Sequence, residues 1–272
     1  FPSFIPTNVG MSLNDKDSPL LNRAFASFNL GSVFKLITSA AALECGIRPD
    51  FTYDCQGFNQ VEDAKFKCFN SKKHEEVNME QALAHSCNGY FIELIKKMPY
   101  DSVLKMAKKF RLGSPNTLAP EMSSYAGKLP SEESLKDMKT LANFSFGQGK
   151  LLASPVQISG VINTIASEGV YSNPKLIKSL VNEAKKENLK ILNIIPKEKE
   201  RIISKRNADI IKGHMKASMD YGTSSKGLPE NTSAGAKTST AQTGIIEDGK
   251  RVEQSWFAGF FPYENPKYTV VI

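Results

Sequence analysis

The stretch that decides the fold runs from Gly31 to Glu44 and reads GSVFKLITSAAALE. Its apolar residues recur at helical spacing, its alanine run favours a helix, and Gly46 ends it. We therefore predict a helix that begins at Ser32 and ends at Glu44. Because residues i and i+3 share a helix face, we expect the Lys35 amine to lie beside the Ser32 hydroxyl.

Outward from this helix, the sequence predicts further helices in the middle of the chain and a sheet at its end. Residues 50–75 read as irregular and residues 114–140 as loop-rich. The apolar spacing predicts helices at Asn78–Met98, with a break near Ser86, at Asp101–Phe110 and at Pro155–Glu168. Apolar and β-branched runs predict strands at Lys237–Gln242, Ser255–Phe261 and Tyr268–Ile272. Helices first and an antiparallel sheet late indicate an α+β fold.

Composition limits the classes of protein to consider. The chain has 272 residues, of which 40% are hydrophobic, enough for one large domain or two intergrown lobes. Its formal net charge of +7 suits an anionic partner, but no basic block is interleaved with aromatic residues, so we expect no nucleic-acid partner. No apolar run approaches the roughly 18 residues that span a bilayer. The chain begins abruptly and ends within an apolar strand, so we expect both ends to be truncated.

Three short motifs contain the residues that could take part in catalysis or binding: Ser32 with Lys35, Ser86 with Asn88, and Lys237–Thr240. A serine hydroxyl is a weak nucleophile that needs a base, and a lysine with a lowered pKa can be that base. A strand that carries a lysine and several hydroxyls can receive a substrate carboxylate as an added strand. Taken singly, each motif is also compatible with an ordinary helix cap, a turn or a polar edge strand.

The order and spacing of the three motifs, S-x-x-K, S-x-N and K-T-S, are similar to the signature of penicillin-interacting serine enzymes. The chain resembles the transpeptidase domain of class B penicillin-binding proteins, of the elongation or sporulation type, over nearly its whole length. Further segments that carry the resemblance are Ala82–Phe91, Phe146–Gly149 with Ser154–Gln157, Tyr221–Thr223 and Trp256–Pro262.

This resemblance implies a penicillin-binding, serine β-lactamase-like fold, in which an antiparallel sheet flanked by helices is joined by an all-helical lobe. It implies two lobes, one α/β lobe formed by residues 1–45 and 155–272 and one mainly helical lobe formed by residues 46–154. The family's closing strand and C-terminal helix are expected beyond residue 272.

The resemblance also implies a peptidoglycan D,D-transpeptidase reaction. Ser32 attacks the carbonyl carbon of the penultimate D-Ala, the terminal D-Ala leaves, and an amine of a second stem peptide takes the acyl group. Lys35 is the expected base, and Asn88 orients it and the substrate amide. Ser86 is expected to relay a proton towards the leaving amine, with Lys237 nearby. β-Lactams imitate D-Ala-D-Ala and are expected to stall at the acyl-enzyme.

The third motif is expected to hold the substrate. The backbone N–H groups of Ser32 and Thr240 would form the oxyanion hole, and Thr238, Ser239 and Thr240 are the expected substrate-binding residues. Two residues depart from the family pattern, which has Gly where Ser239 and Ala236 stand. We expect Ser239 to be a mild change, with its side chain pointing away from the cleft. We expect Ala236 to add a methyl group close to the substrate strand.

A candidate metal site, Cys55, Cys68, His74 and Cys87, overlaps the second motif. Three thiolates and one imidazole suit tetrahedral Zn²⁺, and the set resembles a structural zinc site of some elongation-type members. An oxidising exterior also allows a disulfide, Cys55–Cys68 or Cys68–Cys87, and free thiols are a third alternative. Cys45 ends an apolar helix and is expected to be a small buried residue. The chemistry itself needs no cofactor.

Three other functions share part of this pattern. A serine β-lactamase needs a second base for deacylation, and Glu121 is the only residue in the loop-rich stretch that we consider for it. A β-lactam sensor keeps the first motif, and a degenerate scaffold binds without turnover. The expected partners are D-Ala-D-Ala stem peptides, β-lactams and, by resemblance, the cell-wall synthesis machinery. The expected location is the extracytoplasmic face of the bacterial cell membrane, reached through an N-terminal anchor helix outside this chain.

Overall fold

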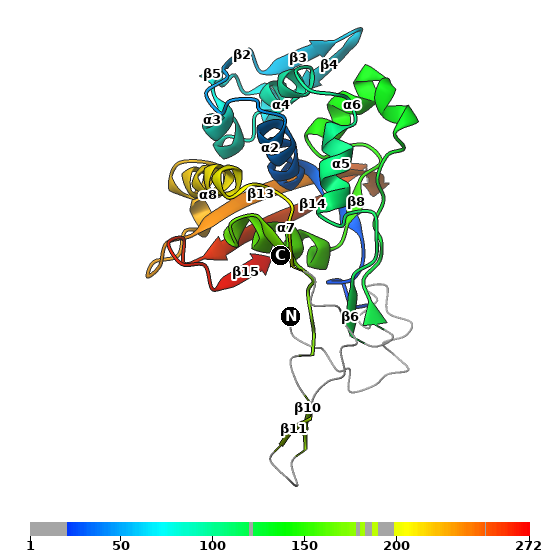
Figure 1. The fold of residues 1–272 in the computed structure, drawn as a ribbon. Coiled ribbons are helices and arrows are strands. Elements are labelled where there is room, and N and C mark those ends of the chain that lie inside the picture. The colour runs from blue at the N-terminus through cyan, green and yellow to red at the C-terminus, as the bar shows by residue number, and fades with distance from the viewer. Residues whose placement is uncertain (1–20, 120–121, 178–179, 183–186, 190–198, 248) are drawn as a thin grey trace.

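The computed structural model describes residues 21–119, 122–177, 180–182, 187–189, 199–247 and 249–272. These residues form an α+β fold around a three-stranded antiparallel sheet (Figure 1). Its α-helices are α2 (Lys35–Glu44), α3 (Met79–Ala84), α4 (Asn88–Ile95), α5 (Ser102–Lys109), α6 (Met138–Ser145), α7 (Pro155–Ala166) and α8 (Lys205–Asp220). Short 3₁₀ helices are η1 (Gly31–Phe34), η2 (Phe69–Ser71), η3 (Glu133–Lys136) and η4 (Ser225–Gly227).

The strands of the main sheet are β13 (Gly235–Glu247), β14 (Lys250–Phe261) and β15 (Tyr268–Val271), with β14 in the centre. The other strands pair two by two: β1 (Phe28–Asn29) with β8 (Leu152–Ala153), β2 (Tyr53–Cys55) with β5 (Glu75–Val77), β3 (Phe58–Val61) with β4 (Ala64–Lys67), β6 (Thr117–Ala119) with β7 (Met122–Ser123), β9 (Val170–Ser172) with β12 (Lys199–Arg201), and β10 (Leu180–Asn182) with β11 (Glu187–Leu189).

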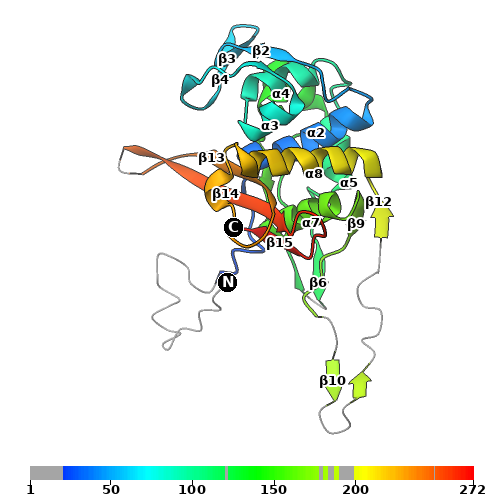
Figure 2. The ribbon, with the colours of Figure 1, turned by 90° about the vertical axis from the view of Figure 1, so that its left-hand side faces the viewer.

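One face of the main sheet carries both the core and part of the third motif. Lys237 pairs with Ala258, and two residues further on Ser239 pairs with Trp256. Paired residues share a face, and alternate residues of a strand return to it. Trp256, Ala258 and Phe260 of that face join the main core, to which α2, α7 and α8 contribute their apolar side chains. Figure 2 shows α8 running along β13, with α2 on the same side of the sheet.

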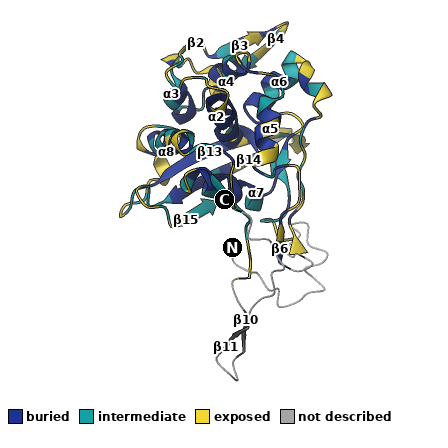
Figure 3. Ribbon diagram, in the orientation of Figure 1, coloured by how far each residue is buried: buried dark blue, intermediate teal, exposed yellow. Residues whose placement is uncertain are grey.

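Helix α2 lies at the centre of the molecule, and nine of its ten residues are buried (Figure 3). It ends in a Schellman cap, in which the Ile47 N–H bonds to Ala42 O and the Gly46 N–H to Leu43 O, both at 3.0 Å. Gly46 has the positive φ of +84° that this cap requires. Because almost the whole helix is enclosed, a lysine in its first turn is held in the interior.

The helices and strands predicted from the sequence are confirmed with shifts at their ends, the largest in the main sheet, where β13 ends five residues later and β14 begins five residues earlier than predicted. The break expected near Ser86 separates α3 from α4, and each of the two helices has its own cap. Asn78 forms a capping box with Gln81 at the start of α3, and Ser154 forms another with Gln157 at the start of α7.

Several regions differ from the prediction, among them the stretch 114–140, where we expected loops and where β6, β7, η3 and the start of α6 lie. Residues 50–75 are not irregular but contain β2–β5 and β3–β4, strands of three or four residues that are too short for a clear alternation. Helix α8 was not predicted, because charged and polar residues outnumber the narrow apolar stripe that faces the core. Within the ranges given above, no helix is both long and apolar enough to cross a bilayer.

Candidate active site

The segments η1–α2 and α3–α4 bring the first two motifs together. Ser32 lies in η1, one turn before Lys35, which begins α2. Ser86 lies in the turn between α3 and α4 and has a φ of +59°, a conformation that residues other than glycine rarely adopt. Asn88 is the first residue of α4. The strained turn therefore presents both the carbonyl and the hydroxyl of Ser86 to Lys35, as the hydrogen bonds show.

The amine of Lys35 is the centre of this arrangement. Its Nζ donates to Asn88 Oδ1 at 2.7 Å and to the backbone oxygen of Ser86 at 2.8 Å. The Oγ atoms of Ser32 and Ser86 each lie 3.1 Å from the same Nζ. Carbonyl oxygens can only accept, so they hold two N–H groups and leave the lone pair of a neutral amine for a hydroxyl. Asn88 keeps its oxygen towards Lys35 because its Nδ2 donates to Lys67 O at 2.9 Å.

The environment of Lys35 favours a neutral amine. The side chain is completely buried. Burial lowers the pKa of Lys35 to about 8, and the nearby thiols of Cys87 and Cys68 oppose a further decrease. A lysine with such a pKa can exist as a base near neutral pH, and the nearest hydroxyls from which it could take a proton are those of Ser32 and Ser86.

Glycines fix the backbone around Ser32. Gly31 has a φ of +59°, and its N–H donates to Gly147 O at 2.9 Å. Gly147 has a φ of +84°, and a Cβ at that position would lie 1.9 Å from Gly31 O. Only glycine allows this approach, so the Phe146–Gly149 segment seats η1. On the other side, Trp256 Nε1 donates to Asn29 O at 2.7 Å and ties the chain before η1 to β14.

The third motif places a second buried lysine beside the first. Lys237 Nζ donates to Thr238 O at 2.8 Å and to Thr223 Oγ1 at 3.3 Å. Burial holds the pKa of Lys237 well below its usual value, and the charge of Lys35 lowers it further. The Oγ1 atoms of Thr238 and Thr223 lie 3.0 Å apart. Thr240, at the exposed end of the motif, completes the strand edge.

Thr223 is a residue of this site to which the sequence analysis gave no role. Its backbone N–H donates to Ala84 O at 2.9 Å, which fixes the loop after α8 against the end of α3. The preceding residue is glycine, and a Cβ there would lie 2.4 Å from the same oxygen. The signal in the sequence was the segment Tyr221–Thr223, which resembles the family but stands far from the third motif along the chain.

The expectation for Ser239 was wrong. Its side chain points towards the first motif, where Oγ accepts a hydrogen bond from the Ser32 backbone N–H at 2.6 Å. Only 6% of the residue is exposed. The reason is strand alternation, because Ser239 stands two residues after Lys237 and must share its face.

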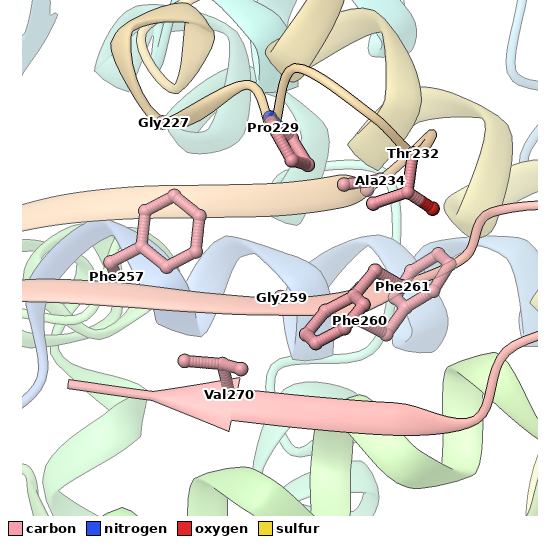
Figure 4. Close-up of a pocket in the computed structure, with 10 residues that line it drawn as sticks. Gly227, Pro229, Thr232, Ala234, Phe257, Gly259, Phe260, Phe261 and Val270 are labelled. Atoms are coloured by element: carbon pink, nitrogen blue, oxygen red, sulfur yellow. The ribbon is translucent and has the colours of Figure 1, made fainter.

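Ala236 lies on the opposite face of β13. Its methyl group packs with Met219 and Ala234 in a small apolar cluster that includes Phe257 and Phe261. A pocket of about 220 Å³ lies beside this cluster, between the loop after η4 and the strands β14 and β15 (Figure 4). Its lining contains none of the residues of the three motifs. Packing therefore accommodates the added methyl group on the side of β13 that faces away from Ser32.

Cys55, Cys68, His74 and Cys87 converge behind the second motif. Their ligand atoms all lie within 4.8 Å of one another. Cys68 Sγ lies 3.7 Å from Cys55 Sγ and 3.9 Å from Cys87 Sγ, and Cys55 Sγ lies 3.5 Å from His74 Nδ1. Sulfur ligands at tetrahedral corners with metal–sulfur bonds of about 2.3 Å are about 3.8 Å apart, so the four side chains could hold a metal ion.

The same cysteines are free thiols in the structure and are not joined as disulfides. The hydrogen bond from Cys87 lowers the pKa of the Cys68 thiol to about 3, although burial opposes this. A thiolate is the form that binds a metal ion. Cys45, which we expected to be buried, is exposed because it follows the last turn of α2 at the surface.

A sheet that covers a buried S-x-x-K helix, with the second and third motifs on either side of the serine, defines the class of penicillin-binding serine enzymes by fold. The chain belongs to the family of penicillin-binding protein transpeptidase domains, whose family model matches residues 5–272.

Relatives and solved structures agree with this assignment. The chain is 29% identical over 265 residues to peptidoglycan D,D-transpeptidase PbpA of Mycolicibacterium smegmatis, and this match covers 95% of the chain and 52% of the relative. It is 26% identical over 280 residues to stage V sporulation protein D of Bacillus subtilis, and this match covers 100% of the chain and 42% of the relative. The imipenem acyl-enzyme complex of penicillin-binding protein A from M. tuberculosis has a TM-score of 0.81 at 25% identity, and covers 97% of the chain and 59% of that structure. The chain thus spans about half the length of the curated relatives it matches.

Proposed function

We propose that this chain is the catalytic domain of a peptidoglycan D,D-transpeptidase that forms an acyl-enzyme on Ser32 and is acylated there by β-lactams. The observation that carries the proposal is the 3.1 Å distance between Lys35 Nζ and Ser32 Oγ, with Asn88 and Ser86 carbonyls holding the other hydrogens of the amine. The name of the mycobacterial relative and the imipenem complex of the similar structure support it.

In the acylation step, neutral Lys35 takes the proton of the Ser32 hydroxyl while Oγ attacks the carbonyl carbon of the penultimate D-Ala. The carbonyl oxygen becomes an oxyanion, which the backbone N–H groups of Ser32 and Thr240 stabilise. The C–N bond then breaks. Ser86 Oγ, 3.1 Å from Lys35 Nζ, passes a proton from the lysine to the leaving amine, and the terminal D-Ala departs.

The strand side of the cleft orients the substrate. The hydroxyls of Thr238 and Thr240 receive the carboxylate of the terminal D-Ala, with Lys237 behind them and Ser239 on the face of Ser32. An amine of a second stem peptide then attacks the acyl-enzyme and Lys35 takes a proton from that amine. The ester bond between the acyl carbon and Ser32 Oγ breaks, and Lys35 gives the proton to Oγ, which restores the hydroxyl. We propose that the cleft lies between a lobe of residues 1–45 and 155–272 and a mainly helical lobe of residues 46–154.

Intact-mass measurement after incubation with a β-lactam tests the proposal. The parent chain should gain the mass of one β-lactam, and Ser32→Ala should gain none. Ser39→Ala is the matched control, because Ser39 is buried in the same helix and its Oγ has no hydrogen-bond partner among the described residues. The control should form the adduct as the parent does. An adduct on Ser32→Ala would overturn Ser32 as the nucleophile.

The lifetime of the adduct and a second substrate separate the alternatives. Rapid loss of the adduct with hydrolysed antibiotic would indicate a β-lactamase; Glu121, the residue considered for its second base, lies outside the described residues. A stable adduct without turnover of a D-Ala-D-Ala thioester would indicate a sensor, and no adduct on a folded chain would indicate a scaffold. A stable adduct with thioester turnover is the expected result.

We propose further that Cys55, Cys68, His74 and Cys87 hold a structural Zn²⁺. The sulfur–sulfur distances of 3.7 and 3.9 Å fit a tetrahedral site and exceed the roughly 2.05 Å of a disulfide almost twofold. Cys87 stands between Ser86 and Asn88, so the ion would tie β2, the loop before β5 and the second motif together. The free energy of zinc binding would then stabilise this part of the fold.

Metal analysis of the purified chain tests the zinc site. We expect one zinc per chain, and a chelator should lower both the melting temperature and the rate of β-lactam acylation. Cys55→Ser should lose the metal and the stability, whereas Cys45→Ser should keep both, because Cys45 is exposed and outside the cluster. A metal-free chain that is two hydrogens lighter than the reduced form would support a disulfide instead.

The whole protein is proposed to act at the extracytoplasmic face of the bacterial cell membrane. An anchor helix ahead of this chain would hold it there, close to its stem-peptide substrates and the cell-wall synthesis machinery. This part of the proposal rests on the resemblance to cell-wall synthesis relatives.

A further inference from the structure

The hydroxyl of Ser239 makes a contact that the proposed reaction does not use. Its Oγ accepts a hydrogen bond from the backbone N–H of Ser32 at 2.6 Å. The same N–H is one of the two donors that would stabilise the oxyanion during acylation. One donor of the proposed oxyanion hole is therefore already engaged by a side chain of the protein itself.

The geometry leaves Ser239 little freedom to avoid this contact. Strand β13 passes so close to η1 that a Cβ on Gly31 would lie 2.3 Å from Ser239 Oγ and 3.0 Å from Ala241 Cβ. Gly31 is in turn fixed by its bond to Gly147 O. The space between the strand and the residue before the nucleophile thus has room for one hydroxyl, and Ser239 fills it.

We propose that Ser239 is a specificity-determining residue whose hydroxyl occupies the Ser32 N–H until an acyl donor displaces it. This inference rests on the proposed function. A neutral carbonyl oxygen entering the site exchanges one neutral hydrogen bond for another, so binding gains little from this donor. The oxyanion forms a charge-assisted bond roughly twice as strong, so displacement becomes favourable only as the charge develops. Acyl donors that are slow to develop that charge are disfavoured most.

Removal of the hydroxyl should therefore release the donor. Ser239→Ala should raise the second-order rate constant of acylation by a β-lactam about tenfold, the value of one neutral hydrogen bond. Ser239→Gly should give a similar or larger increase, because it also removes Cβ. Gln242→Ala, an exposed residue further along β13, is the control and should acylate at the rate of the parent. Melting curves would show that all three variants are folded.

A second measurement reports on the contact without any reaction. Amide hydrogen exchange, followed by NMR, should become faster at Ser32 in Ser239→Ala, while the neighbouring amides of α2 keep their protection. An unchanged exchange rate at Ser32 would overturn the inference, because the hydrogen bond would then not protect this N–H.

The kinetic outcomes separate this inference from the function on which it rests. Equal acylation rates in the parent and Ser239→Ala would overturn the inference alone. A slower rate in Ser239→Ala would also overturn it and would make the hydroxyl an additional donor to the oxyanion. Absence of a Ser32 adduct from the parent and every variant would overturn the proposed function, and the inference with it.

Discussion

Ser32 is approached by two groups of residues, a helical wall and a strand wall, and each wall surrounds a buried lysine in its own way. In the helical wall (Lys35, Ser86 and Asn88), the amine of Lys35 has four oxygen atoms within 3.1 Å. In the strand wall (Lys237, Thr238 and Ser239), the amine of Lys237 has Thr238 O at 2.8 Å and one threonine hydroxyl at 3.3 Å. Burial lowers both pKa values, to about 8 for Lys35 and well below the usual value for Lys237, which also faces the charge of Lys35.

This difference shows how one residue type can serve two purposes. The carbonyls of the helical wall orient the Lys35 amine towards the Ser32 hydroxyl, which is what a base requires. The hydroxyls around Lys237 instead form a network along the strand, where we propose that the substrate carboxylate binds. Both departures from the family pattern, Ser239 and Ala236, lie on β13. The helical wall has the S-x-x-K and S-x-N patterns unchanged, and Cys87 of the cysteine–histidine cluster stands between Ser86 and Asn88.

Replacement of Lys35 is expected to have the largest effect on the acylation rate and so tests the difference between the two walls most directly. Lys35→Met should lower the second-order rate constant of β-lactam acylation about a thousandfold, because it removes the base, and Lys237→Met should lower it less. Only the neutral amine accepts a proton, so the rate of the parent should rise with pH and level off above about 8, as the pKa of Lys35 requires. A greater loss in Lys237→Met would assign the base to the strand wall.

Substitutions at two glycines test whether the backbone contact beside Ser32 is needed to position its hydroxyl between the two walls. Gly147 and Gly149 both have a positive φ, +84° and +80°, so alanine is strained at either position. At Gly147 the new Cβ would lie 1.9 Å from Gly31 O, whereas at Gly149 the nearest atom is 3.7 Å away. Gly147→Ala should displace Ser32 and lower the acylation rate about a hundredfold.

Gly149→Ala is the matched control, because it places alanine at a positive φ without a contact to Gly31 and so reports the effect of the backbone strain alone. It should lose some thermal stability but keep an acylation rate within about twofold of the parent, because nothing near Ser32 moves. If the two variants lost activity equally, the strain of a positive φ would explain both results. The contact between Gly31 and Gly147 would then have no special part in placing the nucleophile.

Much of the helical wall could be predicted from the sequence, because its decisive relations are local. Spacing along one helix places Lys35 beside Ser32, and the break at Ser86 follows from two poor helix formers, Ser86 and Asn88, on either side of one position. The strand wall depends on which face of β13 meets η1. Alternation puts Ser239 on the face of Lys237, but only the packing of the sheet against η1 brings that face to Ser32.

Thr223 is the remaining link between the walls, and its replacement is the smallest expected effect. Its hydroxyl contacts Lys237 Nζ and Thr238 Oγ1, while its N–H bonds to Ala84 at the end of α3. Thr223→Val keeps the shape and the backbone bond but removes the hydroxyl, and should lower the acylation rate about fivefold through loss of the hydrogen bonds from Lys237 and Thr238. Thr223→Ser should restore the rate with the same melting temperature. If valine instead kept the rate of the parent and serine were slow, the methyl group and not the hydroxyl would be what Thr223 contributes, and the strand wall would not depend on it for its hydrogen-bond network.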